Sequence, residues 1–108
     1  MKIIILFLTC ANLEEAEKIS QALLKKKLVV CIKKTNVLSS FLWEGKLDKS
    51  EEVLLIMDSI EEKFAEIEKE VRKIHSYETF VLVANPVINS SKGVKEWIKK
   101  EIKLNYFD

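Results

Sequence analysis

FLWEGK, at residues 41–46, places a tryptophan beside one of the chain's two glycines, in a polar run between two apolar segments. The preceding apolar run, residues 28–32, continues with a more polar pattern into this stretch, and residues 53–57 are apolar again. Glu44 and Gly45 suit a tight turn, because glycine readily adopts the backbone conformations that turns require. The sequence therefore predicts a long β-hairpin with its tip at this turn.

The predicted hairpin is much longer than a small core requires. Its distal half carries Phe41, Leu42 and Trp43, with little of the same chain left to cover them. Such an apolar tip is either frayed or a surface for another subunit. Phe41, Trp43, Glu44 and Gly45 are therefore candidate interface residues.

Alternating strand and helix patterns surround the hairpin. Residues 3–8 are continuously apolar and rich in β-branched side chains, which is typical of a buried strand. Asn12 can cap the following helix, and Glu15 is placed to reach back in a capping-box-like pair. Ser59 and Glu62 form a second such pair before the next helix. The apolar positions on the three predicted helical faces are Leu13, Ala16, Ile19, Leu23 and Leu24; Ile60, Phe64, Ile67, Val71 and Ile74; and Val94, Trp97, Ile98 and Ile102.

These patterns predict the element order strand, helix, strand, strand, helix, strand, helix. The last strand, residues 80–84, ends near Pro86, which cannot donate to a sheet, and Ser91 opens the last helix. The first six elements form the split βαβ unit of ferredoxin-like folds. The predicted fold class is α+β, a ferredoxin-like βαββαβ sandwich with an added C-terminal helix, in a single domain over residues 1–108.

Both faces of the predicted sheet need to be covered. The strands are apolar at consecutive positions, so both faces carry apolar side chains. Right-handed crossovers place the two crossover helices on one face of an antiparallel sheet, and one terminal helix cannot cover the whole of the other. The sequence therefore predicts an oligomer.

Composition favours a globular cytoplasmic protein without a nucleic-acid or membrane partner. Hydrophobic residues make up 48% of the chain, the net charge is +1, and Arg72 is the only arginine, so little is available to bind a polyanion.

The apolar run at residues 3–8 is short for a secretion signal and no cleavage site follows it. No run approaches the ~20 apolar residues of a membrane helix. Cys10 and Cys31 lack zinc or CxxC spacing and are expected to be reduced and buried.

HSYE, at residues 75–78, is the main candidate for a functional motif. His75 could bind a metal or carry a proton, since histidine titrates near neutrality, or it could cap the preceding helix as a structural residue. Tyr77 and Glu78 either line a cleft or are ordinary residues at the start of a strand. The sequence contains no nucleophile–histidine–acid set and no phosphate-binding glycine loop, so no enzyme is predicted.

At these motifs the chain resembles the CutA family, named for tolerance of divalent cations. The opening strand ends in a threonine, Thr9, and residues 27–31 (KLVVC) are similar to the family's second strand start. Residues 43–46 match its tryptophan-centred turn, and residues 75–78 resemble its histidine-proline-tyrosine-acid motif. Trp97 falls where the family has a tryptophan in its last helix. The resemblance covers nearly the whole chain and implies a trimer of ferredoxin-like subunits.

The chain departs from the family pattern at several positions. Ser76 replaces the usual proline, and Phe80 stands where a second proline is common. Leu8 aligns with a cysteine of the copper-linked bacterial members, and Ile74 aligns with the first of the paired histidines in one member. Of that copper-binding set only His75 is present, so the resemblance does not transfer a metal site intact.

Two functions are compatible with these residues. The first is a CutA-like homotrimer that responds to divalent cations and binds a metal or small ligand at subunit interfaces without catalysis. The second is a ferredoxin-like enzyme or ligand-gated regulatory subunit that uses His75 and Glu78 in an inter-subunit cleft lined by Tyr77.

For the first function we expect weak binding of copper or another divalent cation at His75, with oxygen ligands such as Glu78. Imidazole suits copper and must be neutral to bind it, so binding should weaken below about pH 6. Cys10 and Cys31 are not expected to take part.

Overall fold

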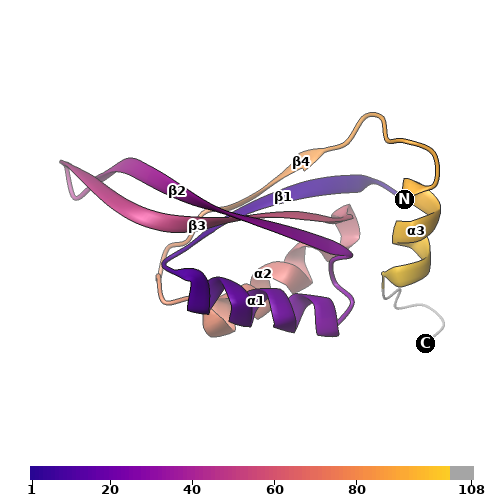
Figure 1. Ribbon diagram of the computed structural model, residues 1–108, viewed down its shortest axis with the longest axis horizontal. Coiled ribbons are helices and arrows are strands. Elements are labelled where there is room, and N and C mark those ends of the chain that lie inside the picture. Colours follow the sequence, from indigo (N-terminus) through magenta and orange to yellow (C-terminus); the bar gives the residue numbers. More distant parts are fainter. Residues whose placement is uncertain (103–108) are drawn as a thin grey trace.

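The computed structural model describes residues 1–102 as an α+β fold with a four-stranded antiparallel sheet and three helices (Figure 1). Residues 103–108, which the predicted domain includes, lie outside the described residues. Within the described part, no helix is long and apolar enough to cross a membrane. The elements are β1 (Ile3–Cys10), α1 (Leu13–Lys25), β2 (Cys31–Trp43), β3 (Lys46–Ile60), a 3-10 turn η1 (Glu61–Lys63), α2 (Phe64–Ile74), β4 (Leu82–Pro86) and α3 (Val94–Glu101).

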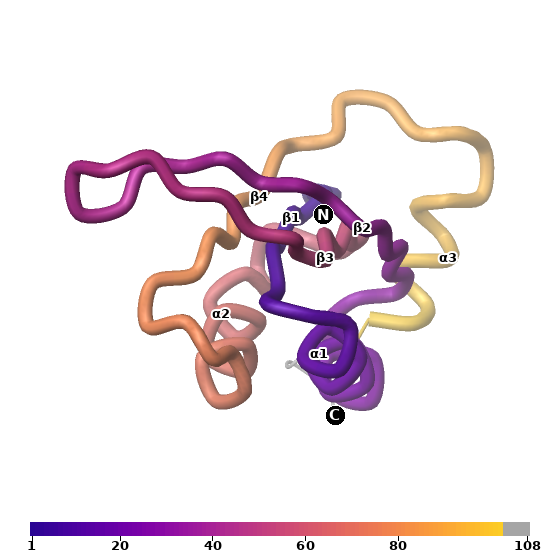
Figure 2. Tube along the Cα trace, turned by 60° about the vertical axis from the view of Figure 1, so that its left-hand side comes forward, coloured from indigo at the N-terminus to yellow at the C-terminus, as the bar shows by residue number. Residues whose placement is uncertain are grey.

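The sheet has the strand order β2-β3-β1-β4, and all its neighbouring strands are antiparallel. Helices α1 and α2 lie side by side on one face of the sheet (Figures 1 and 2). Leu6 and Leu8 of β1 point to this face and are fully buried, whereas Phe7 points to the opposite face and is half-buried. In the sheet register Phe7 lies between Ile56 of β3 and Val83 of β4. Apolar side chains thus line both faces, as predicted.

The core has two parts. The larger part lies between the sheet and helices α1 and α2. The smaller part holds α3 at the end of the sheet near the N-terminus, where Ile98 and Ile102 pack with Ile3 and Ile60 (Figure 1). The buried members of the larger cluster are Ile4, Leu6, Leu8, Cys10, Ala16, Ile19, Leu23, Leu28, Val29, Val53, Leu55, Met57, Ile67 and Val71.

The cap of α1 forms as the sequence predicts. Asn12 Oδ1 accepts a 2.9 Å hydrogen bond from the Glu15 amide, and Glu15 Oε2 accepts a 2.8 Å bond from the Ala11 amide. The carboxylate therefore reaches one residue further back than in a standard capping box. This cap fixes the Glu15 side chain at the point where β1 passes into α1.

The second predicted capping box, Ser59 with Glu62, is wrong. Ser59 lies inside β3, and its hydroxyl donates to the Leu28 carbonyl rather than to a helix terminus. Strand β3 keeps its pairing with β1 as far as Ile60, so sheet hydrogen bonds extend over the predicted helix start. Helix α2 begins only at Phe64, after the 3-10 turn.

Several side chains differ from expectation in position or exposure, among them Leu13 and Leu24 of the first predicted helical face, which are 58% and 39% exposed. Trp97, which the sequence pattern places on the apolar face of the last helix, is 44% exposed, because α3 buries Ile98 and the following Ile102 and leaves Trp97 beside them at the surface. Cys31 is half-buried rather than buried, since it begins an edge strand. Phe80 precedes β4 instead of opening it, and its ring packs on His75.

The hairpin of β2 and β3 projects beyond the helices as a two-stranded ribbon (Figures 1 and 2). We call residues 38–51 of this ribbon the arm. At its tip Trp43 pairs with Lys46, and Glu44 and Gly45 have φ values of 50° and 77°. Positive φ at both central residues is typical of the tight turns whose twist matches that of paired strands. The predicted turn is confirmed.

Candidate functional site

The loop after α2 brings the predicted motif to the junction of β1 and α1. His75 ends α2, and its amide donates a 2.8 Å bond to the Val71 carbonyl. The backbone then turns to an extended conformation, with ψ of 134° at His75. Helix α2 and strand β1 finish at the same end of the sheet (Figure 1), and there the Ser76 amide bonds to Glu15 in the first turn of α1.

Both ring nitrogens of His75 are used within the described structure. Nδ1 is 3.1 Å from the Tyr77 amide nitrogen, and Nε2 is 2.8 Å from the Thr9 carbonyl oxygen. An amide N–H can only donate, so Nδ1 accepts and the neutral ring carries its proton on Nε2, which donates to Thr9. The side chain is fully buried. These two bonds fix the position and tautomer of the ring.

Glu15 is the second polar group of the site. Besides the bond from Ala11, its Oε1 accepts a 2.6 Å bond from the Ser76 amide, and its Oε2 lies 3.6 Å from His75 Nδ1. Burial acts to raise the pKa of Glu15, but the hydrogen bonds from Ser76 and Ala11 stabilise the carboxylate more strongly, and the pKa is lowered. Glu15 is therefore an anion that anchors two backbone amides.

Cys10 completes a cluster that the sequence did not reveal. One ligand-type atom from each of Cys10, Glu15 and His75 lies within 4.8 Å of the others. Cys10 was expected in the core and is buried there, but it also faces this polar group. Burial raises its pKa to about 12, with further increases from the negative charges of Glu15 and Glu52. The side chain is thus a neutral thiol.

Tyr77 and Glu78 point to different surroundings. The Tyr77 hydroxyl donates a 2.8 Å bond to Glu52 Oε2 in β3, and burial, followed by this carboxylate, raises the pKa of Tyr77 to about 12. Glu78 is exposed, and its backbone carbonyl accepts a 3.2 Å bond from Arg72. The structure therefore brings Tyr77 to the base of the arm, whereas Glu78 is not a member of the Cys10 cluster.

Aromatic packing holds the same loop from the other side. The Phe80 ring stacks on His75 with centroids 5.0 Å apart, and the Tyr77 ring lies 4.9 Å from His75 in a tilted arrangement. The Arg72 guanidinium lies 4.6 Å above Phe80. These contacts cover the imidazole with apolar surface and explain its burial.

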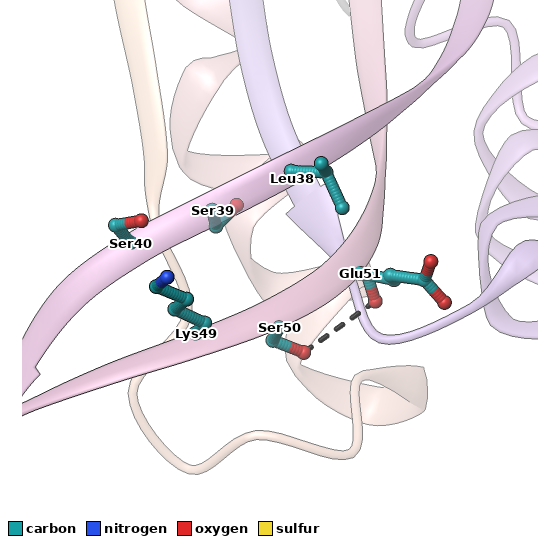
Figure 3. A pocket seen from close by; sticks show the side chains of 6 residues that line it. All are labelled: Leu38, Ser39, Ser40, Lys49, Ser50 and Glu51. Atoms are coloured by element: carbon teal, nitrogen blue, oxygen red, sulfur yellow. Dashed lines mark hydrogen bonds between the residues drawn. The ribbon is translucent and has the colours of Figure 1, made fainter.

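Two open hollows lie along the hairpin. The one at the arm's base, of ≈ 530 Å³, is lined by the start of α1 and by both hairpin strands, including Asn12, Asn36, Glu51 and Glu52. The one on the arm itself, of ≈ 320 Å³, is lined by Leu38, Ser39, Ser40, Lys49, Ser50 and Glu51. Figure 3 shows these six side chains along the two ribbon strands, where Ser50 bonds the Glu51 carbonyl. Both hollows are built largely from exposed residues.

The cluster does not fit a resident metal ion in this geometry. Neither nitrogen of His75 offers a free lone pair, Glu15 already accepts from two amides, and the Cys10 thiol is protonated. Metal ligands must be deprotonated and available, and of this set only the Glu15 carboxylate is deprotonated with lone pairs left, so the cluster offers one ligand and not three. The predicted copper binding by His75 with Glu78 stays a prediction, and it requires the loop to rearrange.

Comparison with known proteins identifies the family. The model of the CutA1 divalent ion tolerance protein family matches residues 4–101, nearly the whole described chain. The chain belongs to this family. The "Divalent-cation tolerance protein CutA" of Archaeoglobus fulgidus is 38% identical over 98 residues, covering 91% of this chain and 96% of that protein. The protein of the same name from Thermotoga maritima is 30% identical over 99 residues, covering 92% and 98%.

Solved structures of CutA proteins share the fold. The structure described as the periplasmic divalent cation tolerance protein CutA from Archaeoglobus fulgidus superposes with a TM-score of 0.91 at 37% identity, covering 94% of this chain and 99% of that one. CutA1 from Oryza sativa gives a TM-score of 0.93 at 24% identity, covering 97% of both chains, and shows the likeness of fold alone. The resemblance inferred from the hairpin and HSYE motifs is thus confirmed at the level of the family.

Proposed function

We propose that this CutA1-family chain acts as a homotrimer of ferredoxin-like subunits in the response to divalent cations, binding a cation or small ligand between subunits without turnover. The family membership supports the role in divalent-cation tolerance, because the relatives that match over nearly their full length carry that name. The exposed apolar side chains of the arm are the main observation that supports assembly. The proposal includes a cytoplasmic location, on the two free cysteines, and no nucleic-acid or membrane partner, on the near-neutral charge of the chain.

The arm exposes apolar side chains that a monomer would leave in water. Leu38, Leu42 and Leu47 are 82%, 72% and 85% exposed, and Leu42 lies directly opposite Leu47 in the ribbon. Trp43, at the tip, is 57% exposed. An isolated two-stranded ribbon is marginally stable at best, so the arm needs a surface to pack against. A neighbouring subunit supplies one without further components.

The sheet face opposite α1 and α2 supports the same assembly. Phe7, Ile56 and Val83 form a continuous row across three strands on this face, and Val83 is 47% exposed. Apolar surface of this kind is typical of subunit interfaces. Strands β2 and β4 are the sheet edges, so they are also available for pairing between subunits. Closed symmetry with three copies would cover the faces and edges together.

The hollow at the arm's base is the proposed ligand site. Among the described residues, Asn12 and Asn36 provide amides there, and Glu51 and Glu52 provide carboxylates. Carboxylate and amide oxygens suit hard divalent cations and the amino or hydroxyl groups of small metabolites. In a trimer the arm of a neighbour would bring further groups to this hollow, which is open in one subunit.

A ligand-gated regulatory subunit or enzyme that uses His75 and Glu78 is the second candidate. The observation that favours a regulatory role is the bond between Tyr77 and Glu52, which connects the loop to a strand lining the hollow. A ligand at the hollow would thus act on the loop through one side chain.

Thermal melting of the trimer with added ligands separates the two candidates. A divalent-cation binder should melt at a higher temperature with Cu²⁺, Zn²⁺ or Mn²⁺ than with a neutral salt of equal ionic strength, because a ligand that binds only the folded state stabilises it. Glu51→Gln should reduce that shift, and Glu68→Gln on α2 is the matched control. A small organic ligand that raises the melting temperature far more than any cation would support the regulatory subunit instead.

A further inference from the structure

His75 is the only histidine of the chain, and it lies at the centre of a buried hydrogen-bond network. We propose that His75 is a positioning residue, a neutral clamp that fixes the loop of residues 75–78 against β1 and α1, and that it does not ligate copper or zinc in the folded chain. This inference goes beyond the proposed function, because it concerns one subunit and not the ligand between subunits.

Both ring nitrogens of His75 already make hydrogen bonds to the backbone. Nε2 donates to the Thr9 carbonyl at 2.8 Å, and Nδ1 accepts from the Tyr77 amide at 3.1 Å. A metal ion at Nδ1 would displace the Tyr77 amide, and one at Nε2 would displace the Thr9 carbonyl. Either substitution would leave a backbone group without its partner in a buried region, which opposes binding.

The two neighbouring side chains, Glu15 and Cys10, are also poor metal ligands in this structure. Glu15 accepts from the Ala11 and Ser76 amides, so a metal would have to compete with two charge-assisted hydrogen bonds for this carboxylate. Cys10 is buried, and burial raises its pKa to about 12, so its thiolate is scarce at neutral pH. Three metal-type side chains thus lie together, yet His75 offers no free lone pair and Cys10 no thiolate, and the one remaining carboxylate does not make a metal site.

The hydrogen bonds of residues 75–77 hold the loop against three elements of the fold. His75 ties the loop to Thr9 of β1, Ser76 ties it to Glu15 of α1, and Tyr77 ties it to Glu52 of β3. Three consecutive residues therefore contact three elements that meet beside the hollow at the arm's base. The central position of the ring makes the Tyr77 amide, and with it the Tyr77 side chain, dependent on His75.

Nitrogen-15 NMR of the imidazole tests the proposal on the wild-type protein, expressed without a histidine tag. Because the chain has one histidine, its two ring-nitrogen signals need no further assignment to a residue. At pH 7.5 we expect one signal of a protonated nitrogen, Nε2, and one of an accepting nitrogen, Nδ1, both unchanged when excess Zn²⁺ is added. A proton on Nδ1 at this pH, or a zinc-dependent shift of either ring nitrogen that persists in Glu51→Gln, where cation binding at the hollow is reduced, would overturn the proposal.

Two substitutions add a second readout. Glutamine can place an amide N–H close to the position of Nε2–H, so His75→Gln should keep part of the melting temperature that His75→Ala loses. Zinc titration calorimetry of His75→Gln should match that of wild type. A saturable zinc site that disappears in His75→Gln while the protein stays folded would contradict the clamp. The tautomer that NMR reads before zinc is added is independent of the oligomeric mass and of ligand binding at the hollow, so its failure would leave the proposed function standing.

Discussion

The Tyr77 hydroxyl donates a 2.8 Å hydrogen bond to Glu52 Oε2, and this bond joins the loop after α2 to the strand at the base of the arm. The two residues are 25 positions apart in sequence. Glu52 is buried and Tyr77 is half-buried, so water competes weakly for the bond. The loop that holds His75 and the proposed ligand hollow are therefore mechanically connected.

Removing this bond should destabilise the protein. Tyr77→Phe should lower the free energy of unfolding by about 1.5–3 kcal/mol, the range for a hydrogen bond to a charged group. Urea unfolding of wild type and variant at equal protein concentration measures the difference. In a double-mutant cycle with Glu52→Ala, which removes the acceptor, the two losses should not add, whereas losses with the exposed Glu51→Ala should add. Additive losses in both cycles would show that the bond contributes nothing.

Glu70 should control part of the stability at low pH. Lys26 at the end of α1 and Lys73 in α2 each donate to its carboxylate at 2.8 Å, and only the Lys26 bond joins the two helices. These bonds, Lys26 first, lower the pKa of Glu70 to about 2. Because the folded pKa lies below the unfolded value, this contribution is complete above the unfolded pKa and is lost as pH falls toward about 2.

Acid unfolding of Glu70→Gln tests this contribution. The variant should be less stable than wild type at pH 7 and should lose less stability between about pH 4.5 and pH 2. Glu68→Gln, which removes an exposed pair with Arg72, is the control and should follow the wild-type curve. A Glu70→Gln curve parallel to that of wild type across this range would contradict the assignment.

The two cysteines should differ in reactivity. Cys10 is buried with its pKa raised to about 12 by burial, whereas Cys31 is half-buried near the Lys33 ammonium, at 3.6 Å. The thiolate is the reactive form, so a thiol reagent at pH 8 should modify Cys31 first in the native protein and Cys10 only after unfolding. Mass spectrometry of the peptides reads the order directly. Equal rates at both sites in the native state would contradict the burial of Cys10.

Trp43 should contribute to assembly rather than to the fold of one subunit. We expect Trp43→Ala to weaken the proposed trimer by a few kcal/mol, on the order found for large aromatic side chains at interface centres. Its melting temperature should then depend more steeply on protein concentration than that of wild type. Trp43→Phe keeps an aromatic ring and should lie between the two. If Trp43→Ala melts as wild type does at every concentration, the residue is only part of the hairpin tip.

The order of elements was predictable from sequence because it depends on local periodicity. The apolar strand patterns, the cap at Asn12 and the turn at Gly45 act within a few residues, and all three are confirmed. Element ends were harder where long-range pairing competes with local signals. Ser59 has good capping chemistry, but pairing of β3 with β1 continues past it, and so the cap does not form.

The polar cluster was not predictable for a related reason. Cys10, Glu15 and His75 come from β1, α1 and the end of α2, and the bond between His75 and Thr9 spans 66 positions. His75 was recognised as a candidate, and Glu78 was named as its partner because it is near in sequence. The signal that could have indicated Glu15 was its place in the first turn of α1, since β1 and α2 finish at the same end of the predicted sheet.

Light scattering of the wild-type protein tests most directly whether the arm and the open sheet face assemble three chains. The subunit mass is 12.5 kDa. At micromolar concentration and physiological salt we predict a single species with three times this mass, and Trp43→Ala should shift it toward smaller masses on dilution. A wild-type mass equal to that of one subunit under these conditions would contradict the proposed assembly and leave the exposed leucines of the arm without a partner.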